Sequence, residues 1–188
     1  YDYYQRPVYE NMTFTNVRIP RGTNGLFRNC TFIGVVWVET EEGCVDPNWN
    51  YTGSVEPDGS GGFIDRFPDL VSELGSDILE DTRDHSNNLR FDGCTFLGSL
   101  AGDQPGEYTH WRNKIQLTGN TRFYIDPYDP DLLLESDAST LQSNLLSLTE
   151  EDREELARSS VLAPGWSVDV GNFDNETASR IKLKGTIV

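Results

Sequence analysis

The stretch Gly25-Leu-Phe-Arg-Asn-Cys-Thr-Phe-Ile-Gly-Val-Val-Trp37 is echoed further along the chain by Leu89-Arg-Phe-Asp-Gly-Cys-Thr-Phe-Leu-Gly98. A shorter version, from Met12 to Ile19, precedes both. Within these blocks an apolar residue stands two positions before a larger one, and the pairs advance in steps of five. The positions that coincide between the two long blocks are Phe27/Phe91, Cys30/Cys94, Thr31/Thr95, Phe32/Phe96 and Gly34/Gly98.

Apolar residues two positions apart are typical of a β-strand with one buried face. The step to the next pair indicates that the chain turns and starts a new strand. Repeats of this kind are typical of solenoids, in which each coil packs its apolar face on the coil before it. The repeat predicts short strands at Tyr9–Phe14, Asn16–Ile19, Gly25–Phe32 and Val35–Val38.

Three asparagines, Asn11, Asn16 and Asn29, each stand two residues after an aromatic residue. Asparagine tolerates turn conformations and hydrogen-bonds to nearby backbone. We expect these residues to turn the chain and to hydrogen-bond to the next coil, which is a structural role.

The cysteines leave two alternatives open. Cys30 and Cys94 hold the same place in the repeat, so they are either two small buried thiols in adjacent core sites or a disulfide between coils. Cys44, in a polar loop, is left over, and three cysteines are not the even set of a disulfide framework.

Two regions interrupt the repeat. Residues 39–88 form an insertion that begins acidic and rich in glycine and proline, and helical spacing of apolar residues predicts a helix over Phe67–Leu79. Residues 132–160 are predicted to be a helical decoration, in which Thr149-Glu-Glu-Asp152 is similar to a capping box. Such a helical segment would cover an open side or end of the stack.

The net charge of −16, from 15 basic and 31 acidic residues in 188, argues against nucleic acid as a partner. Phosphate backbones are bound by clustered lysine and arginine, which this composition does not supply. No run of eighteen apolar residues is present, so no membrane span is predicted. The chain begins at Tyr1 and ends within a strand pattern at Lys182–Val188, and we expect a single domain over 1–188 that is a piece of a longer protein.

The Cys30-Thr-Phe32 and Cys94-Thr-Phe96 steps resemble pentapeptide-repeat coils and, more broadly, right-handed parallel β-helices. The resemblance covers about a third of the chain. The runs are too short for a regular pentapeptide tower, and an irregular β-helix of the pectate-lyase type, decorated with loops and helices, fits better. The expected fold is therefore mainly β. The resemblance implies a place among polysaccharide lyases and hydrolases, phage tailspikes, adhesins or bacterial surface proteins, and fold alone does not choose among these.

Candidate catalytic residues follow from that resemblance. Asp81, Asp84 and His85 would supply two carboxylates and an imidazole for acid and base roles, as in β-helix polysaccharide enzymes. Trp111 and Arg112 would stack on a sugar. The alternative reading is structural in both cases: a hydrogen-bonded connector for the first group, and a packing cluster at a coil edge for the second.

No cofactor is required by the sequence, but calcium is the metal that one loop suits. Asp126, Asp129 and Asp131 alternate with prolines, and oxygen-rich loops supply the hard ligands of calcium. The spacing is not that of an EF-hand. The alternative is a turn shaped by proline whose carboxylates face water.

The reading that follows is a non-enzymatic structural module, extracellular or at the cell surface, that self-assembles into a filament or surface layer or serves adhesion. An unpaired coil end is an adhesive edge unless it is capped, so copies of itself or other surface proteins are the expected partners. A carbohydrate-active or carbohydrate-binding β-helix protein, with polysaccharide as partner, is the alternative. A third reading, a cytoplasmic mimic of DNA charge, predicts a long regular run of five-residue steps, which the sequence lacks.

Overall fold

The computed structural model describes residues 6–41, 55–65, 84–106, 112–171, 181–183 and 187. Within these residues the fold is mainly β, built from parallel sheets with few helices, as the sequence predicts. No helix in the described part of the chain is long and apolar enough to cross a membrane.

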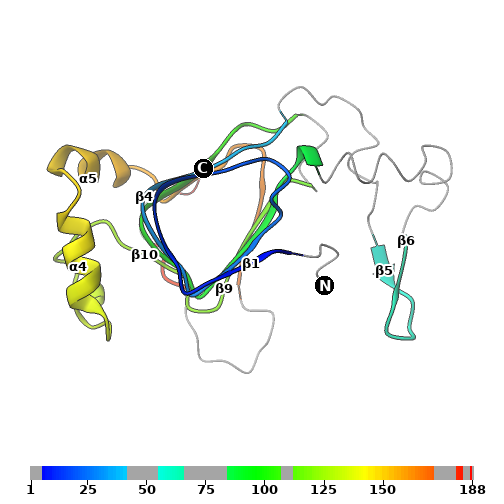
Figure 1. The fold of residues 1–188 in the computed structure, drawn as a ribbon, viewed down its shortest axis with the longest axis horizontal. Coiled ribbons are helices and arrows are strands. Elements are labelled where there is room, and N and C mark those ends of the chain that lie inside the picture. Colours follow the sequence, from blue (N-terminus) through cyan, green and yellow to red (C-terminus); the bar gives the residue numbers. More distant parts are fainter. Residues whose placement is uncertain are drawn as a thin grey trace.

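Two sheets of parallel strands make up the body of the molecule (Figure 1). The first sheet has the order β1 (Val8–Glu10), β3 (Leu26–Arg28), β7 (Asn88–Asp92), β9 (Lys114–Thr118) and β12 (Ser167–Val170). The second has the order β2 (Thr13–Ile19), β4 (Thr31–Val38), β8 (Thr95–Gly102) and β10 (Arg122–Phe123), with β11 (Val161–Leu162) also paired to β8. From β1 to β10, each strand of the first sheet is followed along the chain by a strand of the second. The pairs β1–β2, β3–β4, β7–β8 and β9–β10 therefore lie next to one another in that order.

The two long repeats lie side by side in parallel register. Thr31 pairs with Thr95 and Phe32 with Phe96 in the second sheet, and Phe27 pairs with Phe91 in the first. The prediction that the two Cys-Thr-Phe segments stack directly on each other is therefore confirmed.

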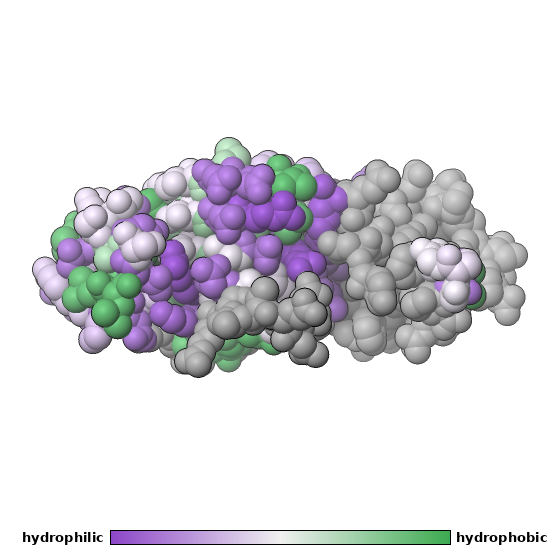
Figure 2. Space-filling model, turned by 90° about the horizontal axis from the view of Figure 1, so that it is seen from below, coloured by the Kyte–Doolittle hydropathy of each residue, from purple (hydrophilic) through white to green (hydrophobic). Residues whose placement is uncertain are grey.

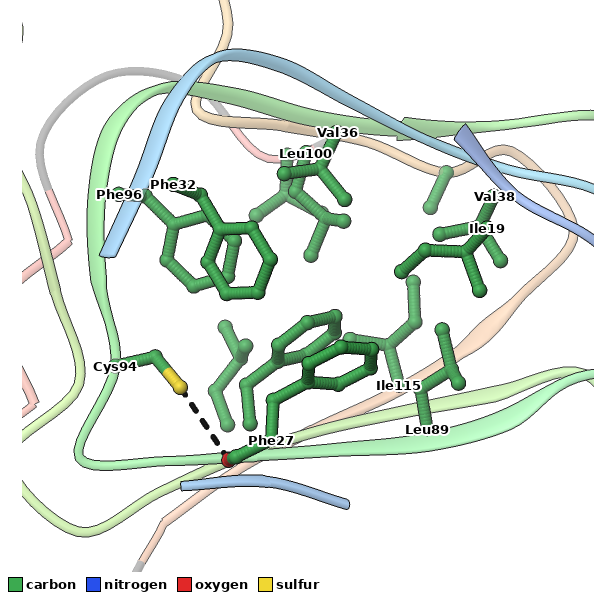
Figure 3. Packing of buried hydrophobic residues seen from close by; sticks show 14 of the residues in the cluster. Ile19, Phe27, Phe32, Val36, Val38, Leu89, Cys94, Phe96, Leu100 and Ile115 are labelled. Atoms are coloured by element: carbon green, nitrogen blue, oxygen red, sulfur yellow. Dashed lines mark hydrogen bonds between the residues drawn. The ribbon is translucent and has the colours of Figure 1, made fainter. Parts of the chain in front are cut away.

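Stacked aromatic rings occupy part of the space between the sheets, beside aliphatic side chains such as Val36, Leu100 and Ile115 (Figure 3). One stack runs through the second sheet, with ring centroids 5.2, 4.9 and 4.4 Å apart, and consists of Phe14, Phe32, Phe96 and Phe123. A second stack, with spacings of 4.8 and 5.1 Å, runs through Tyr9, Phe27 and Phe91 in the first sheet. Rings of the two stacks meet edge to face. Both geometries are favoured by the quadrupole of the aromatic ring, so these ring contacts hold neighbouring strands and the two sheets together.

Left-handed residues make the corner between the sheets. Asn11 and Asn29 have φ angles of 56° and 51°, and each separates a first-sheet strand from a second-sheet strand. The strands end before Asn11 and Asn29, so the unbroken strands predicted over Tyr9–Phe14 and Gly25–Phe32 were wrong at these points. The turning role predicted for Asn11 and Asn29 is confirmed, whereas Asn16 lies within the continuous strand β2. Asn16, with φ of 47°, lies at a bulge within β2, and its Oδ1 accepts a hydrogen bond at 3.1 Å from Val35 N in the paired strand β4.

Three helices, α3 (Pro130–Leu133), α4 (Ala138–Leu146) and α5 (Glu150–Leu156), lie on the outer side of the second sheet (Figure 1). Thr149 caps α5 by accepting a hydrogen bond from Asp152 N, which confirms the predicted cap. Apolar residues on the outer face of the sheet and on α3 and α4 form a second buried cluster. Its members are Ile33, Leu97, Tyr124, Leu132, Leu141 and Leu145.

A polar network ties the helical segment to the sheet. Glu135 accepts hydrogen bonds from Arg122 at 2.6 Å, from the Tyr124 hydroxyl at 2.7 Å and from Lys182 at 3.1 Å. These residues come from β10, the segment after it and the last described residues of the chain. The network therefore joins parts of the chain that are far apart in sequence.

The described part of the insertion is an antiparallel hairpin of β5 (Val55–Pro57) and β6 (Phe63–Asp65). Asp58 closes its turn, because its Oδ1 accepts hydrogen bonds from Ser60 N and Gly62 N at 2.8 and 2.9 Å. The helix predicted over Phe67–Leu79 lies outside the described residues.

Candidate functional site

The first strand of each sheet forms one end of the stack, which we call the N-terminal edge (β1 and β2). Among the described residues, none pairs with the outer side of either strand. Val8 and Met12 are 54% and 45% exposed at this edge. Tyr9, Phe14 and Val17 are partly buried against the core beneath them. The edge therefore offers open backbone groups beside apolar side chains.

The opposite end, which we call the C-terminal edge, consists of β12 with Lys182 and Ile187. Lys182 bridges to Arg122 and Ile187 bridges to Val161, so both residues continue the second sheet. Val170 and Ile187 are 44% and 45% exposed. Val168 and Leu183 pack against the core and are partly buried. This edge is also apolar.

Exposed strand edges are binding surfaces by their chemistry, because each row of free N–H and C=O groups can pair with another strand. The sequence predicts that an end of the stack is open but does not identify its residues. The apolar spacing at Met12/Phe14 and Val17/Ile19 is the signal that marks the first edge. The second edge has no comparable signal, because the sequences around Val170 and Ile187 do not match the repeat.

On the side of the molecule shown in Figure 2, hydrophobic residues form separate groups among hydrophilic ones. The described surface on that side therefore offers no continuous apolar area. The two edges are better candidates for a binding surface, because there apolar side chains coincide with strands that have no outer partner among the described residues.

Two of the three catalytic candidates lie in the described part of the chain. Asp84 is exposed, and the chain around it is held by its backbone: the His85 carbonyl accepts a hydrogen bond from Glu41 N at 2.9 Å and the Ser86 carbonyl one from Gly22 N at 2.8 Å. Asp81 lies outside the described residues. These hydrogen bonds join the backbone at His85 and Ser86 to two neighbouring segments of the chain.

Of the two residues predicted to stack on a sugar, the structure describes one. Trp111 lies outside the described residues, and Arg112 is only 4% exposed. A buried guanidinium presents little surface to a sugar ring. Its burial favours the packing alternative for Arg112.

Two of the three calcium candidates, Asp126 and Asp129, accept hydrogen bonds from the local backbone through their carboxylates. Asp126 Oδ1 accepts a hydrogen bond from Tyr128 N, and Asp129 Oδ1 accepts one from Asp131 N, both at 2.8 Å. Asp129 thereby caps α3. Over the described ranges, no three carboxylate, histidine or cysteine side chains are grouped as a metal site.

Asp126 and Asp129 do line a surface pocket of about 440 Å³ between their loop and α5. Arg153, the cation of this lining, donates hydrogen bonds to the carbonyls of Leu148 and Leu145 at 2.7 and 3.2 Å. Carboxylates therefore dominate the pocket, whose chemistry suits a cationic group better than an anion. The lining residues are Ile125, Asp126, Pro127, Tyr128, Asp129, Glu150, Arg153, Glu154 and Ala157.

Cys30 and Cys94 are free, buried thiols at equivalent places before β4 and β8. Of the two alternatives, the structure therefore has two packed thiols and not a disulfide. The Cys30 sulfur lies 3.4 Å from the Tyr9 carbonyl oxygen, and the Cys94 sulfur lies 3.3 Å from that of Phe27 (Figure 3). Contact with the Cys30 sulfur, together with burial, raises the pKa of the Cys94 thiol. A buried thiol of raised pKa is a weak nucleophile, which fits a packing role. Cys44 lies outside the described residues.

Neither a protein-family model, nor a curated protein, nor a solved structure matches this chain.

Proposed function

We propose that the chain is a right-handed parallel β-helix, in which each coil contributes one strand to each sheet. The alternation of first-sheet and second-sheet strands along the chain supports this architecture, as do the parallel register and the repeated corner at Asn11 and Asn29. A stack of this kind resists bending because neighbouring coils share backbone hydrogen bonds and aromatic contacts.

The function that we propose for it is structural: a non-enzymatic module, extracellular or at the cell surface, that assembles with further copies of itself into a filament or surface layer, or adheres to other surface proteins. The observation that carries this proposal is the pair of open apolar edges at opposite ends of the stack. An unprotected strand edge pairs with other strands unless charge, proline or a covering element prevents it.

Purified chain examined by negative-stain electron microscopy and by analytical ultracentrifugation tests the proposal. We expect ordered filaments or sheets whose length grows with protein concentration. A strictly monomeric chain at all concentrations up to about 1 mM, the usual weak limit of specific association, would contradict self-assembly.

The carbohydrate alternative rests on Asp81, Asp84, His85, Trp111 and Arg112, of which the structure describes Asp84, His85 and Arg112. It predicts that polysaccharide is cleaved by the wild-type chain and not by Asp84→Asn. Filaments without any cleavage would favour the structural module.

A further inference from the structure

We propose that copies of this chain join head to tail, with the N-terminal edge of one copy seated on the C-terminal edge of the next. This inference rests on the proposed self-assembly and specifies which surfaces meet and in what register. It follows from the columns of side chains that the parallel register creates, a column being the set of residues paired across successive strands.

The first sheet contains an unbroken apolar column. Tyr9 pairs with Phe27, Phe27 with Phe91, Phe91 with Leu117, and Leu117 with Val170. Tyr9 and Val170 are thus the two ends of the same column. In a head-to-tail contact the Tyr9 of one copy lies over the Val170 of the next, and the column continues.

The second sheet repeats this arrangement. One column runs through Val17, Val36, Leu100 and Val161 and ends at Ile187. In this column the Val17 of one copy meets the Ile187 of the next.

The aromatic stack supplies a third column. It begins at Phe14 and runs through Phe32 and Phe96 to Phe123. Leu183 follows Lys182, which pairs with Arg122, so Leu183 stands next to Phe123 in register. All three columns therefore begin and end on apolar side chains.

Strand direction favours this contact over a contact between two like edges. Every strand pair in both sheets is parallel, and head-to-tail stacking adds one more parallel pair to each sheet. Two N-terminal edges related by a twofold axis would meet antiparallel. The corners at Asn11 would then no longer coincide, and the three columns would be broken.

The charges at the two edges permit the contact. The chain carries −16 overall, yet β1 and β2 carry one acid and one base, Glu10 and Arg18. At the C-terminal edge the described residues again carry one of each, Asp169 and Lys182. Asp169 pairs with Lys114 within its own copy. Each edge is thus locally neutral on an otherwise acidic molecule.

A contact between two different surfaces does not close on itself, so it generates a filament rather than a dimer. New strands join at the ordinary separation of about 4.8 Å. The filament axis therefore continues the stacking direction of the sheets.

Edge variants provide the test. Val8→Lys with Met12→Lys blocks the N-terminal edge, and Val170→Lys with Ile187→Lys blocks the C-terminal edge. All four positions are about half exposed, so folding is expected to survive, and circular dichroism checks it. Leu133→Lys with Leu134→Lys is the matched control, because it adds the same charge at exposed positions on α3 and its C-terminal cap.

Wild type and control are expected to form filaments, whereas each edge variant alone is monomeric, with association weakened by more than about tenfold. An equimolar mixture of the two edge variants is expected to form dimers and nothing larger, because each partner retains one working edge. Sedimentation velocity distinguishes these species.

The inference is overturned, with self-assembly intact, if wild type assembles but either edge variant still self-associates, or if the mixture stays monomeric. A monomeric wild type overturns both the proposed function and this inference. The two failures are therefore distinguishable.

Discussion

At the scale of single residues, two paired glycines allow the neighbouring strands β4 and β8 to approach each other closely. Gly34 and Gly98 pair in register between β4 and β8, with φ angles of 80° and 150°. A Cβ added at Gly98 would lie 2.7 Å from the Gly34 carbonyl carbon, and one added at Gly34 would lie 3.1 Å from Asn16 Cγ. Because neighbouring strands are tied by their ladder, this contact cannot relax without moving backbone. The repeated glycine of the sequence is thus required by the close pairing of β4 and β8.

Gly98→Ala is therefore expected to destabilise the fold by about 3 kcal/mol or more, from backbone strain plus overlap. Gly171→Ala is the matched control, because Gly171 has a similar φ of 157° and nothing within 4 Å of an added Cβ. Chemical denaturation of the two variants measures the difference. Equal losses of stability would show that the close approach to Gly34 has no energetic weight.

At the scale of elements, the helical segment depends on one carboxylate for its attachment to the second sheet. Glu135 is mostly buried and contacts Arg122, Tyr124 and Lys182. Burial alone would raise the pKa of its carboxyl, but the hydrogen bonds from Tyr124 and Lys182 and the nearby cations outweigh it and hold the pKa below its usual value. The same burial and contact raise the pKa of Tyr124, which stays a hydrogen-bond donor.

Glu135→Gln is expected to cost about 1–3 kcal/mol near neutral pH, because it removes a charged acceptor from this network. A carboxyl whose folded pKa is depressed contributes stability above its unfolded pKa of about 4.3 and loses that contribution as the pH falls through the folded value. The gap between wild type and variant should therefore be full at pH 7 and should shrink below about pH 4. Thermal unfolding across this range measures it, and a gap that widens in acid would contradict the assignment.

The cap of α5 gives a smaller prediction at the same scale. Thr149→Ala removes the acceptor for Asp152 N and is expected to cost about 1 kcal/mol. Thr149→Ser keeps the hydroxyl and serves as control. Loss of the same stability in both variants would assign the effect to the methyl group instead of the cap.

At the scale of the whole molecule, the net charge of −16 opposes the assembly that we propose. The edges are locally neutral, so the repulsion between copies comes from the rest of the surface and acts over distances that salt screens. The balance between apolar edge pairing and this long-range repulsion should set the concentration at which filaments form.

Raising the ionic strength from about 0.01 M to 0.15 M shortens the screening length from about 30 Å to 8 Å, and filaments are expected at lower protein concentration. Light scattering against salt concentration measures this. A filament that dissolves in salt would instead indicate that ion pairs hold the copies together.

The sequence by itself determined the mainly β class, the parallel stacking of the two Cys-Thr-Phe segments and the turning role of Asn11 and Asn29. It could do so because the two long repeats share the same residues at the same spacing, so their register is visible without coordinates. The strand breaks at Asn11 and Asn29 were missed, because an apolar alternation does not show where a left-handed residue interrupts it.

Only the tertiary structure decided which strands lie at the edges and what joins the distant segments. Leu117 and Val170 continue the column of Phe27 and Phe91, yet no repeat marks them. A buried column requires apolar residues of adequate volume and not one residue type, so phenylalanine, leucine and valine replace one another in it. The sequence also does not reveal the attachment through Glu135. Its polar partners are separate in the sequence, and only folding brings them together.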